Sequence, residues 1–405
     1  MTETSNPIDT VLRGVCDLVT EQALRDKLAL DRPLRVKLGI DPTASDIHLG
    51  FAVVLRKLRQ FQDLGHQAVL IVGDYTAQLG DPSGKNTTRP MLTEAQVREN
   101  AASYIQQMGK ILDLERLEVR HNSEWFSKFG FLDTMRLASR LTVARTLERA
   151  DFAKRMAAEQ PIGLHELFYP MMQGYDSVMV EADIELGGAD QRFNLLVGRQ
   201  LQPHFGQPPQ VCLMMPLLVG LDGVRKMSKS YGNYIGIDEP PEQQYGKTMS
   251  IPDTLMPEWF RLCTDLPEAE IARILAGHPG EAKHRLAREI VTLYHGPEAA
   301  ERAAEHFRRT VIEKQVPEDV PSHTIESALY DDEGRVPLAA VLADAFGMSR
   351  GEARRLIRQG AVRLDEQRIT DPQARFVPRS GQLLRAGKRR WVRLVAAQVP
   401  GADAG

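Results

Sequence analysis

Residues 36–51 read VKLGIDPTASDIHLGF, a short strand followed by a turn and the start of a helix. Apolar residues alternate along 36–40, and the turn formers at 41–45 end the predicted strand. Asp46 is expected to cap the helix that follows. Such a unit points unpaired backbone N–H groups and a positive helix end at one small volume, which suits a phosphate. His48 can donate to a phosphate oxygen there, and Gly50 leaves room for a flat base, although many such units are purely structural.

Composition narrows the class of protein. The chain has 405 residues, 42% hydrophobic and 26% charged, which is ordinary for a soluble protein of two or three domains. The start MTETSNPID is polar and no run approaches the roughly 18 apolar residues of a spanning helix, so we expect a cytoplasmic protein without membrane association. Cys16, Cys212 and Cys263 lie far apart, which argues against a disulfide framework or a cysteine-based zinc site.

Charge is distributed unevenly along the chain. The net charge is −3, yet residues 335–395 hold 14 basic and 5 acidic residues, a local balance of +9. A basic segment attached to an acidic body points to a polyanionic partner, usually nucleic acid.

Strands and helices alternate along the first half of the chain. Residues 7–28 are predicted to form one amphipathic helix, and strands are predicted at 68–72, 117–120 and 211–219. This alternation predicts an α/β fold with a Rossmann-like parallel sheet, whose ligands bind at the carboxyl ends of the strands. Residues 240–310 are expected to be helical, and residues 316–334 resemble a linker.

Several polar residues follow predicted strands. The stretch from Gly80 to Lys85 is one residue too short for a P-loop, so its Asp81 either projects into a cleft or lies on a surface turn. Asn122 falls at the end of the strand at 117–120. These positions are candidates for a site at the open edge of the sheet.

One helix carries polar residues within an apolar surround. In LHELFYPMMQGYDSVMV, residues 164–180, Tyr169, Gln173 and Asp176 project from one face. A polar helix face usually meets water. Here the helix is apolar nearly all round, so these side chains are expected to be buried and to have partners.

Two further turns carry functional residue types. LGGADQ, residues 186–191, enters a helix with Asp190 and Gln191 at its start, and its glycines can admit a ribose. GLDGVRKMSKSYG, residues 220–232, holds Lys226 and Lys229 between glycines. Two lysines on a mobile loop can close over phosphates, although such a cluster is often only a solvated turn.

The basic tail is predicted to be a compact α+β module. Two short helices are expected between residues 338 and 360, with strands near 362–364 and 391–394. The second helix carries four arginines that can straddle an RNA backbone, or that simply face water: Arg350, Arg354, Arg355 and Arg358.

Together these segments resemble the bacterial tyrosyl-tRNA synthetases, which are class I aminoacyl-tRNA synthetases. DIHLGF resembles the HIGH signature of that class, and KMSKS at residues 226–230 matches its second signature. YPMMQGYD together with GGADQ narrows the resemblance to tyrosine. The similarity covers nearly the whole chain, including a tail similar to a ribosomal-protein RNA-binding module.

The resemblance implies the domain organisation and the partners. A Rossmann-like catalytic domain with an inserted helical dimer-interface segment would span 1–225, and the KMSKS loop with a helical anticodon-recognition domain would span 226–318. A linker at 319–334 would lead to the RNA-binding module at 335–396. The expected substrates are L-tyrosine, tRNA(Tyr) and ATP with Mg²⁺, without a protein-bound metal, and the expected assembly is a homodimer.

The resemblance also implies a role for individual residues. Catalysis would fall to Lys226, Lys229, His48 and Thr43, and ATP would be bound by Asp41, His48, Gly50, Asp190 and Lys229. Tyrosine would be bound by Lys37, Asp81, Asn122, Tyr169, Gln173, Asp176 and Gln191.

Two positions depart from the family pattern. Phe51 replaces the second histidine of HIGH, and Lys37 stands where many relatives have tyrosine, which leaves open what besides Asp176 meets the phenol hydroxyl.

Two alternative functions stay open at this point. The first is a tryptophanyl-tRNA synthetase, which has the same general organisation, although Asp176 with Gln173 and Tyr169 favours a phenol. The second is an RNA-binding paralogue without catalysis, for which Phe51 is the only indication.

Overall fold

The first part of the chain is built on a six-stranded sheet with the order β1-β6-β5-β2-β3-β4. The structure, a computed structural model, describes residues 6–42, 46–78, 93–312, 320–365, 367–387 and 390–396. Five strands are parallel to one another, and they are β2 (Arg35–Ile40), β3 (Gln67–Val72), β4 (Leu117–His121), β5 (Ile184–Gly188) and β6 (Val211–Met215). The edge strand β1 (Asp17–Val19) runs antiparallel to β6. The predicted α/β class with a parallel sheet is confirmed.

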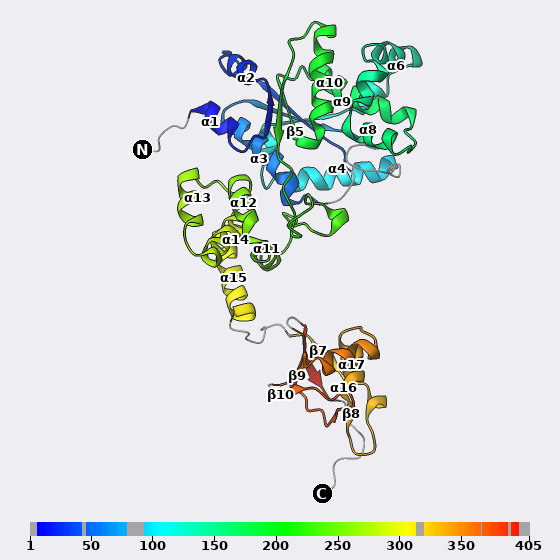
Figure 1. Ribbon diagram of the computed structural model, residues 1–405, viewed down its shortest axis with the longest axis vertical. Coiled ribbons are helices and arrows are strands. Elements are labelled where there is room, and N and C mark those ends of the chain that lie inside the picture. The colour runs from blue at the N-terminus through cyan, green and yellow to red at the C-terminus, as the bar shows by residue number, and fades with distance from the viewer. Residues whose placement is uncertain are drawn as a thin grey trace. The chain divides into compact units, whose positions relative to one another are not determined.

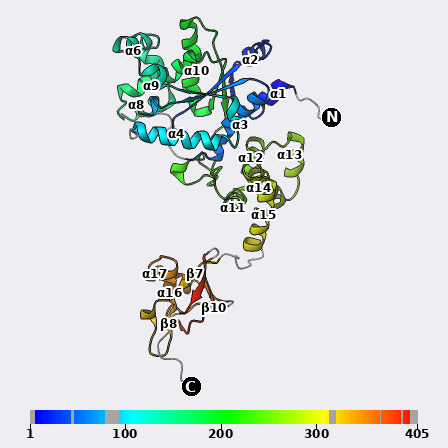
Figure 2. The same cartoon turned by 180° about the vertical axis from the view of Figure 1, so that it is seen from behind.

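Helices cover both faces of this sheet, which explains why β6 and residues 68–72 of β3 are apolar on both sides. Figures 1 and 2 show α3 (Leu49–Asp63) and α4 (Glu94–Met108) on one side, and α9 (Leu164–Met179) and α10 (Arg192–Leu201) on the other. Leu38 packs in the core on the α3 side, whereas Ile71 packs in the core on the α9 side.

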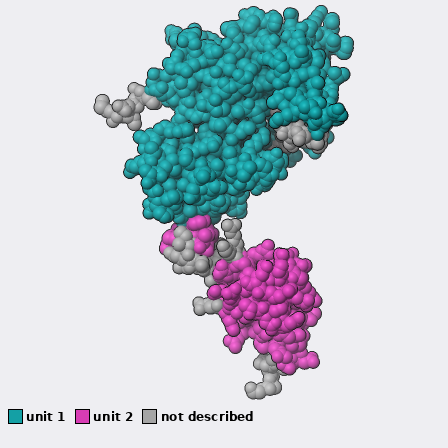
Figure 3. All heavy atoms as spheres, viewed as in Figure 1, with its two compact units in different colours: residues 1–304 teal, residues 305–405 magenta. Residues whose placement is uncertain are grey.

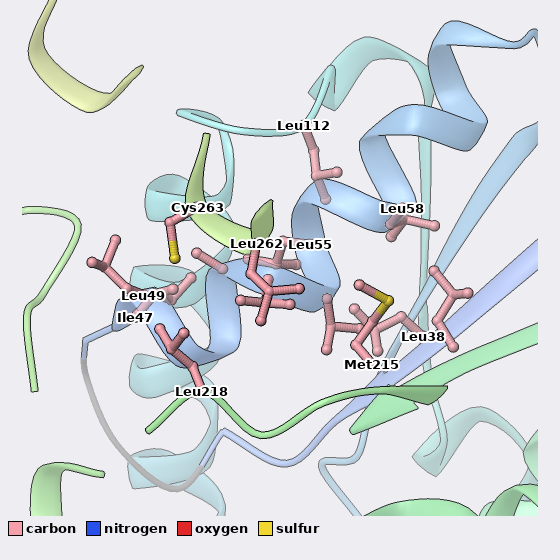
Figure 4. Packing of buried hydrophobic residues seen from close by; sticks show 14 of the residues in the cluster. Leu38, Ile47, Leu49, Leu55, Leu58, Leu112, Met215, Leu218, Leu262 and Cys263 are labelled. Carbon is pink, nitrogen blue, oxygen red and sulfur yellow. The ribbon is translucent and has the colours of Figure 1, made fainter. Parts of the chain in front are cut away.

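The remaining helices of this part lie before, between and after these layers. They are α1 (Pro7–Leu12), α2 (Glu21–Leu28), α5 (Ser123–Phe126), α6 (Phe131–Ala138), α7 (Val143–Leu147), α8 (Ala150–Ala157), α11 (Pro241–Met249), α12 (Met256–Cys263), α13 (Glu268–Leu275), α14 (Pro279–His295) and α15 (Pro297–Phe307). Figure 4 shows Leu262 and Cys263 of α12 in the same apolar cluster as Leu55 of α3 and Met215 of β6, so the later helices share a core with the sheet. Within the described ranges, each helix is too short or too polar to cross a bilayer.

The strand order creates a crevice at the centre of the sheet. From β2 the chain moves outward to β3 and β4, then returns to β5 on the other side of β2. The connections after β2 and β5 therefore diverge, and parallel sheets of this type bind ligands at such a switch point, beyond the carboxyl ends of the strands.

The predicted single helix at residues 7–28 is wrong. The helix ends after α1, and Gly14, two residues later, adopts a positive φ of 72° that suits glycine. The chain forms β1 and then restarts as α2, capped by Thr20, whose hydroxyl accepts from Ala23 N at 3.1 Å. The strand predicted at 211–219 is also shorter than expected and ends at Met215, before Pro216.

Helix α3 begins later than predicted, and Asp46 does not cap it. The N-cap is His48, because the chain before it is held extended. The backbone N–H of Leu49 donates to the carbonyl of Ile235 at 2.9 Å, and His48 forms a β-bridge with Gly236. The partner strand segment lies far along the chain, so local sequence could not reveal this shift.

The C-terminal part forms a separate compact unit, residues 305–405, distinct from the first unit of residues 1–304 (Figure 3). It contains helices α16 (Leu338–Ala345) and α17 (Arg350–Arg358). Its five-stranded sheet has the order β10-β9-β12-β13-β7, made of β10 (Gln367–Ile369), β9 (Val362–Leu364), β12 (Leu383–Ala386), β13 (Arg390–Val395) and β7 (Ser322–Thr324). A small second sheet pairs β8 (Val336–Pro337) with β11 (Arg375–Phe376). The predicted small α+β module is confirmed.

Candidate active site

A cavity of about 630 Å³ lies at the carboxyl ends of β2 and β5, at the switch point of the sheet. The turn after β2, the start of α3, one face of α9, the turn after β5 and the segment at 226–231 all contribute to its wall. The sequence-predicted residues in this wall are Asp41, His48, Gly50, Tyr169, Gln173, Asp176, Asp190, Gln191, Lys226 and Lys229. Thr43 and Asp81 lie outside the described residues.

The start of α3 forms one end of the cavity. His48 Nδ1 accepts from the backbone N–H of Phe51 at 3.3 Å. Burial, then the nearby charges of Lys229 and Lys226, lower the pKa of His48 to about 4, so its ring is neutral at pH 7. With Nδ1 acting as acceptor, the proton of the neutral ring sits on Nε2, which is the donor left for a ligand.

Gly50 lies where the cavity is narrow. A Cβ on Gly50 would lie 3.2 Å from the ring of His48 and 3.3 Å from Cβ of Met227. The backbone N–H of Gly50 faces Sδ of Met227 at 3.3 Å. Glycine therefore keeps this part of the cavity open to a flat group.

Helix α9 supplies the opposite wall, as its spacing predicted. The Tyr169 hydroxyl donates to Oδ2 of Asp41 at 2.8 Å. Oδ1 of Asp41 accepts from the Thr76 hydroxyl at 2.9 Å. Oε1 of Gln173 accepts from Nδ2 of Asn194 at 3.0 Å. Thr76 and Asn194 were not singled out from the sequence, since their partners are 35 and 21 residues away along the chain.

Asp176 lies at the inner end of the cavity and is only 4% exposed. Its Oδ1 accepts from Trp125 Nε1 at 3.0 Å, and its Oδ2 faces Asn122 Nδ2 at 3.5 Å. Burial raises the pKa of Asp176 to about 7, although the charge of Lys37 and the two donors oppose this rise. Sequence reasoning missed Trp125, yet it follows Asn122 by three residues at the same strand end, and that position was the available signal.

Asn122 and Lys37 lie behind the cavity wall, and both are fully buried. Asn122 also donates to the Thr76 hydroxyl at 3.1 Å, so it links the turn after β3 to Asp176. The Lys37 ammonium donates to Ser177 Oγ and Glu185 Oε1 at 2.8 Å and to the Gln173 carbonyl at 2.9 Å. These three bonds use all three of its protons.

Two lysines stand at the mouth of the cavity. Lys226 Nζ donates to Oδ2 of Asp190 at 2.9 Å, and Lys229 forms an ion pair with Asp46. Buried Asn233 holds the loop between them, because its Oδ1 accepts from the backbone N–H of Ser228 at 2.9 Å. Asp46 therefore acts as a partner of Lys229 rather than as a helix cap.

Chemically, the cavity has two different ends. Two ammonium groups, a neutral imidazole donor and a helix N-terminus gather at the mouth, which suits a chain of phosphates. The inner end presents carboxylate, phenol and amide groups, which suit a polar organic molecule with hydrogen-bond donors. Among the described side chains, no cluster of three or more His, Cys, Asp or Glu residues is placed to hold a metal ion.

The predicted RNA-contacting arginines lie in the other unit. Arg350, Arg354, Arg355 and Arg358 are exposed on α17. Ser349 caps this helix by accepting from Glu352 N at 3.1 Å. The arginines thus stand on a well-defined helix rather than on a loop.

Comparisons with known proteins agree with both parts of this description. Residues 29–311 match the family described as class I tRNA synthetases (W and Y), and residues 336–377 match the S4 domain. The tyrosine–tRNA ligase of Moorella thermoacetica is 53% identical over 403 residues, covering 97% of this chain and 96% of that protein. The tyrosine–tRNA ligase of Thermotoga maritima is 48% identical over 388 residues, covering 94% and 95%.

A solved structure is similar as well. The tyrosyl-tRNA synthetase from Archaeoglobus fulgidus, in complex with L-tyrosine, matches with a TM-score of 0.61 and 25% identity. The match covers 74% of this chain and 98% of that one.

Proposed function

The chain belongs to the tyrosyl-tRNA synthetases, a family of class I aminoacyl-tRNA synthetases, and we propose how its side chains divide the work of the reaction. The protein activates tyrosine with ATP and then joins it to tRNA. Relatives named as tyrosine–tRNA ligases match nearly the full chain at about half identity, which decides against the tryptophan enzyme and the non-catalytic paralogue.

Tyrosine is proposed to enter the inner end of the cavity. Its phenol hydroxyl would meet Asp176, and its ammonium would meet Tyr169 and Gln173. Asn122 would hold Asp176 from behind, and Gln191 would line the approach to the carboxylate. Lys37 is proposed to support this pocket rather than to touch tyrosine, since its three protons are already donated within the protein. Asp81 is kept as a further proposed ligand of the ammonium.

ATP is proposed to occupy the mouth. Asp190 would accept from the ribose, Gly50 would face the adenine, and Asp41 would lie between the two substrates. His48 and Thr43 would donate to phosphate oxygens, and Mg²⁺ would enter on the phosphates of ATP, which are its usual ligands. In the free protein Lys226 forms an ion pair with Asp190, and Lys229 forms one with Asp46. When ATP binds, its phosphates would replace these two carboxylates as partners of the lysines.

The chemistry needs no protein nucleophile. The carboxylate of tyrosine is already ionised at pH 7, and one of its oxygens attacks the α-phosphorus. As this bond forms, the bond to the β-phosphate oxygen breaks and pyrophosphate leaves. Lys226 and Lys229 stabilise the charge that builds on pyrophosphate. A ribose hydroxyl at the 3′ end of tRNA(Tyr) then attacks the tyrosyl carbonyl, and AMP leaves.

The observation that carries this assignment is the single cavity that joins an Asp176 pocket to a lysine-lined mouth. The test is exchange of labelled pyrophosphate into ATP with each amino acid added separately. Exchange that depends on tyrosine, and not on tryptophan or phenylalanine, is expected. Exchange supported equally by tryptophan would contradict the pocket assignment.

Exposed apolar side chains in the segment α6–α9 suggest how two copies of the chain associate. Phe131 is 83% exposed, Leu132 60%, Val143 62% and Leu164 77%. Large apolar side chains exposed within one segment of a folded protein often mark a contact surface. We propose that this segment forms the homodimer contact, and that it is inserted in a catalytic domain at 1–225.

The domains after residue 225 are proposed to handle tRNA, with helices at 226–318 reading the anticodon. A linker at 319–334 was expected before the module at 335–396, but β7 (Ser322–Thr324) pairs with β13, so this part of the expected linker belongs to the module. Since tRNA is charged where it is used, the proposed compartment is the cytoplasm.

The tail offers a separate prediction. We expect a chain ending at residue 319 to keep tyrosine-dependent exchange and to charge tRNA poorly, because the α17 arginines bind the RNA backbone. Hydrogen bonds to charged groups contribute ~1.5–3 kcal/mol each, so a roughly tenfold or greater rise in KM for tRNA is expected. Arg350, Arg354 and Arg358 are exposed, so a full-length Arg350→Gln, Arg354→Gln, Arg358→Gln variant should keep the fold and show the same pattern. Equal loss of exchange and charging would mean that the tail serves the catalytic unit instead.

A further inference from the structure

Behind the tyrosine pocket lies a buried ion pair that the reaction does not use directly. Lys37 on β2 and Glu185 on β5 are both fully buried, and Lys37 Nζ lies 2.8 Å from Oε1 of Glu185. Oε2 of Glu185 accepts from Ser177 at 3.1 Å and also from Gln210. A charged pair in such a place is weak evidence for stability, because desolvation offsets most of the attraction.

The hydrogen bonds described for the pair reach the cavity wall at Gln173. Nε2 of Gln173 donates to Oε1 of Glu185 at 3.3 Å, and the Gln173 carbonyl accepts from Lys37 at 2.9 Å. A carboxylate only accepts hydrogen bonds, so the end of the amide that faces Glu185 must be the NH₂ group. Oε1 is therefore turned the other way.

The far end of the amide is fixed by the same logic. Oε1 of Gln173 accepts from Nδ2 of Asn194 at 3.0 Å. Oδ1 of Asn194 in turn faces Nη1 of buried Arg149 at 3.4 Å. A guanidinium only donates, so Asn194 must point its NH₂ group at Gln173. The carboxylate of Glu185 at one end and the guanidinium of Arg149 at the other thus fix which way the side-chain amides of Gln173 and Asn194 point.

Glycine leaves the room that this network needs. A Cβ on Gly198 of α10 would lie 2.6 Å from Gln210 Nε2 and 3.0 Å from Ser177 Oγ. A Cβ on Gly174 of α9 would lie 2.9 Å from Gly198 N. The two helices therefore meet closely, and the network is enclosed on that side.

We propose that Glu185, held by Lys37, is a positioning residue that locks the Gln173 amide so that its oxygen faces the α-ammonium of tyrosine. With one lone pair of Oε1 engaged by Asn194, the other is left to accept from a cation. An amide free to flip would present NH₂ to the ammonium in part of the population and would repel it. This inference rests on the proposed function, in which Gln173 meets that ammonium.

The test separates recognition of the ammonium from recognition of the rest of tyrosine. The Lys37→Met, Glu185→Gln double variant removes both charges, so no unpaired charge is left buried. The amide introduced at position 185 can both donate and accept, so it no longer fixes which end of the Gln173 amide faces it. We expect KM for tyrosine in pyrophosphate exchange to rise about tenfold or more, because the variant weakens a hydrogen bond to a charged group. Inhibition by 3-(4-hydroxyphenyl)propionate, which lacks the ammonium, and KM for ATP should stay within about twofold.

A matched control and a second variant make the result decisive. Asp183, at the amino end of β5, is buried and pairs with Lys27 and Arg32 without touching Gln173. Asp183→Asn should lower the stability of the fold. It should leave unchanged the ratio between KM for tyrosine and the inhibition constant of 3-(4-hydroxyphenyl)propionate. If the double variant does not fold, Asn194→Asp leaves the Lys37–Glu185 pair intact, and its carboxylate should draw the NH₂ of Gln173 toward it. The same selective rise in KM is then expected.

Failure of the positioning role and failure of the proposed contact between Gln173 and tyrosine give different kinetic results. Equal weakening of tyrosine and of the analogue, or no change in either, would overturn the positioning role. In a Gln173→Ala background the change at Glu185 should have no further effect on KM for tyrosine. If Gln173→Ala itself leaves that KM unchanged, the proposed tyrosine contact is wrong, and the inference falls with it.

Discussion

Lys229→Ala is expected to lower the rate of tyrosyl-adenylate formation about 10²-fold or more, while tyrosine affinity stays nearly unchanged. Lys229 stands at the cavity mouth, about one-third exposed, and no described contact joins it to the tyrosine end. Its charge matters most when negative charge moves onto the leaving pyrophosphate, because a contact stronger in the transition state than in the ground state raises the rate. Single-turnover formation of the adenylate measures this rate, and equilibrium dialysis measures tyrosine binding.

Asp46→Asn is the matched control for this prediction. It breaks the ion pair of Lys229 in the free protein and leaves the ammonium in place. If Lys229 acts on the phosphates, this variant should keep most of the rate, and its KM for ATP should be unchanged or lower. A rate that falls as far in Asp46→Asn as in Lys229→Ala would show that the ion pair, and not the free ammonium, is needed. An unchanged rate in Lys229→Ala would refute the role outright.

The parts of this site that depend on local periodicity could be predicted from the sequence. Tyr169, Gln173 and Asp176 share a helix face because a helix repeats every 3.6 residues, and the structure places all three in the cavity wall. The parallel sheet followed from alternating strands and helices in the same way.

The parts that depend on distant partners could not be predicted. Lys37 was expected to bind tyrosine from the resemblance alone, yet its partner Glu185 lies 148 residues away, and pairing with it buries both side chains. The cap of α3 moved to His48 because residues near 236 pair with the chain before it. In each case, long-range hydrogen bonds overrode a local preference.

The residues that support the cavity wall from behind are the main part of the site that the sequence did not predict. Trp125 and Asn194 hold Asp176 and Gln173, but neither residue lies in a recognisable motif. Their importance follows from the rule that buried polar groups need partners, which requires knowing what is buried. Thr43 and Asp81 lie outside the described residues, so their roles rest on the resemblance alone.

Asp176→Ala is expected to remove the preference for tyrosine over phenylalanine. In the unaltered protein, phenylalanine would close the inner end of the cavity while offering Asp176 no hydroxyl. Asp176 is 4% exposed, so water does not readily replace the missing partner. Leaving a buried hydrogen-bonding group without its ligand donor costs ~1–3 kcal/mol, which corresponds to roughly 5- to 160-fold in kcat/KM, and more for a charged group.

The variant should change both substrates in opposite ways. Alanine removes the acceptor for the tyrosine hydroxyl, so kcat/KM for tyrosine falls. It also removes the buried carboxyl group to which phenylalanine offers no donor, so kcat/KM for phenylalanine rises. Asp176→Asn keeps the size of the side chain and one acceptor, and it should lose less of the preference than alanine does. Pyrophosphate exchange with each amino acid gives the two values of kcat/KM. If Asp176→Ala still prefers tyrosine as strongly as the unaltered protein, the hydroxyl is recognised elsewhere and the inner end of the cavity is not its binding site.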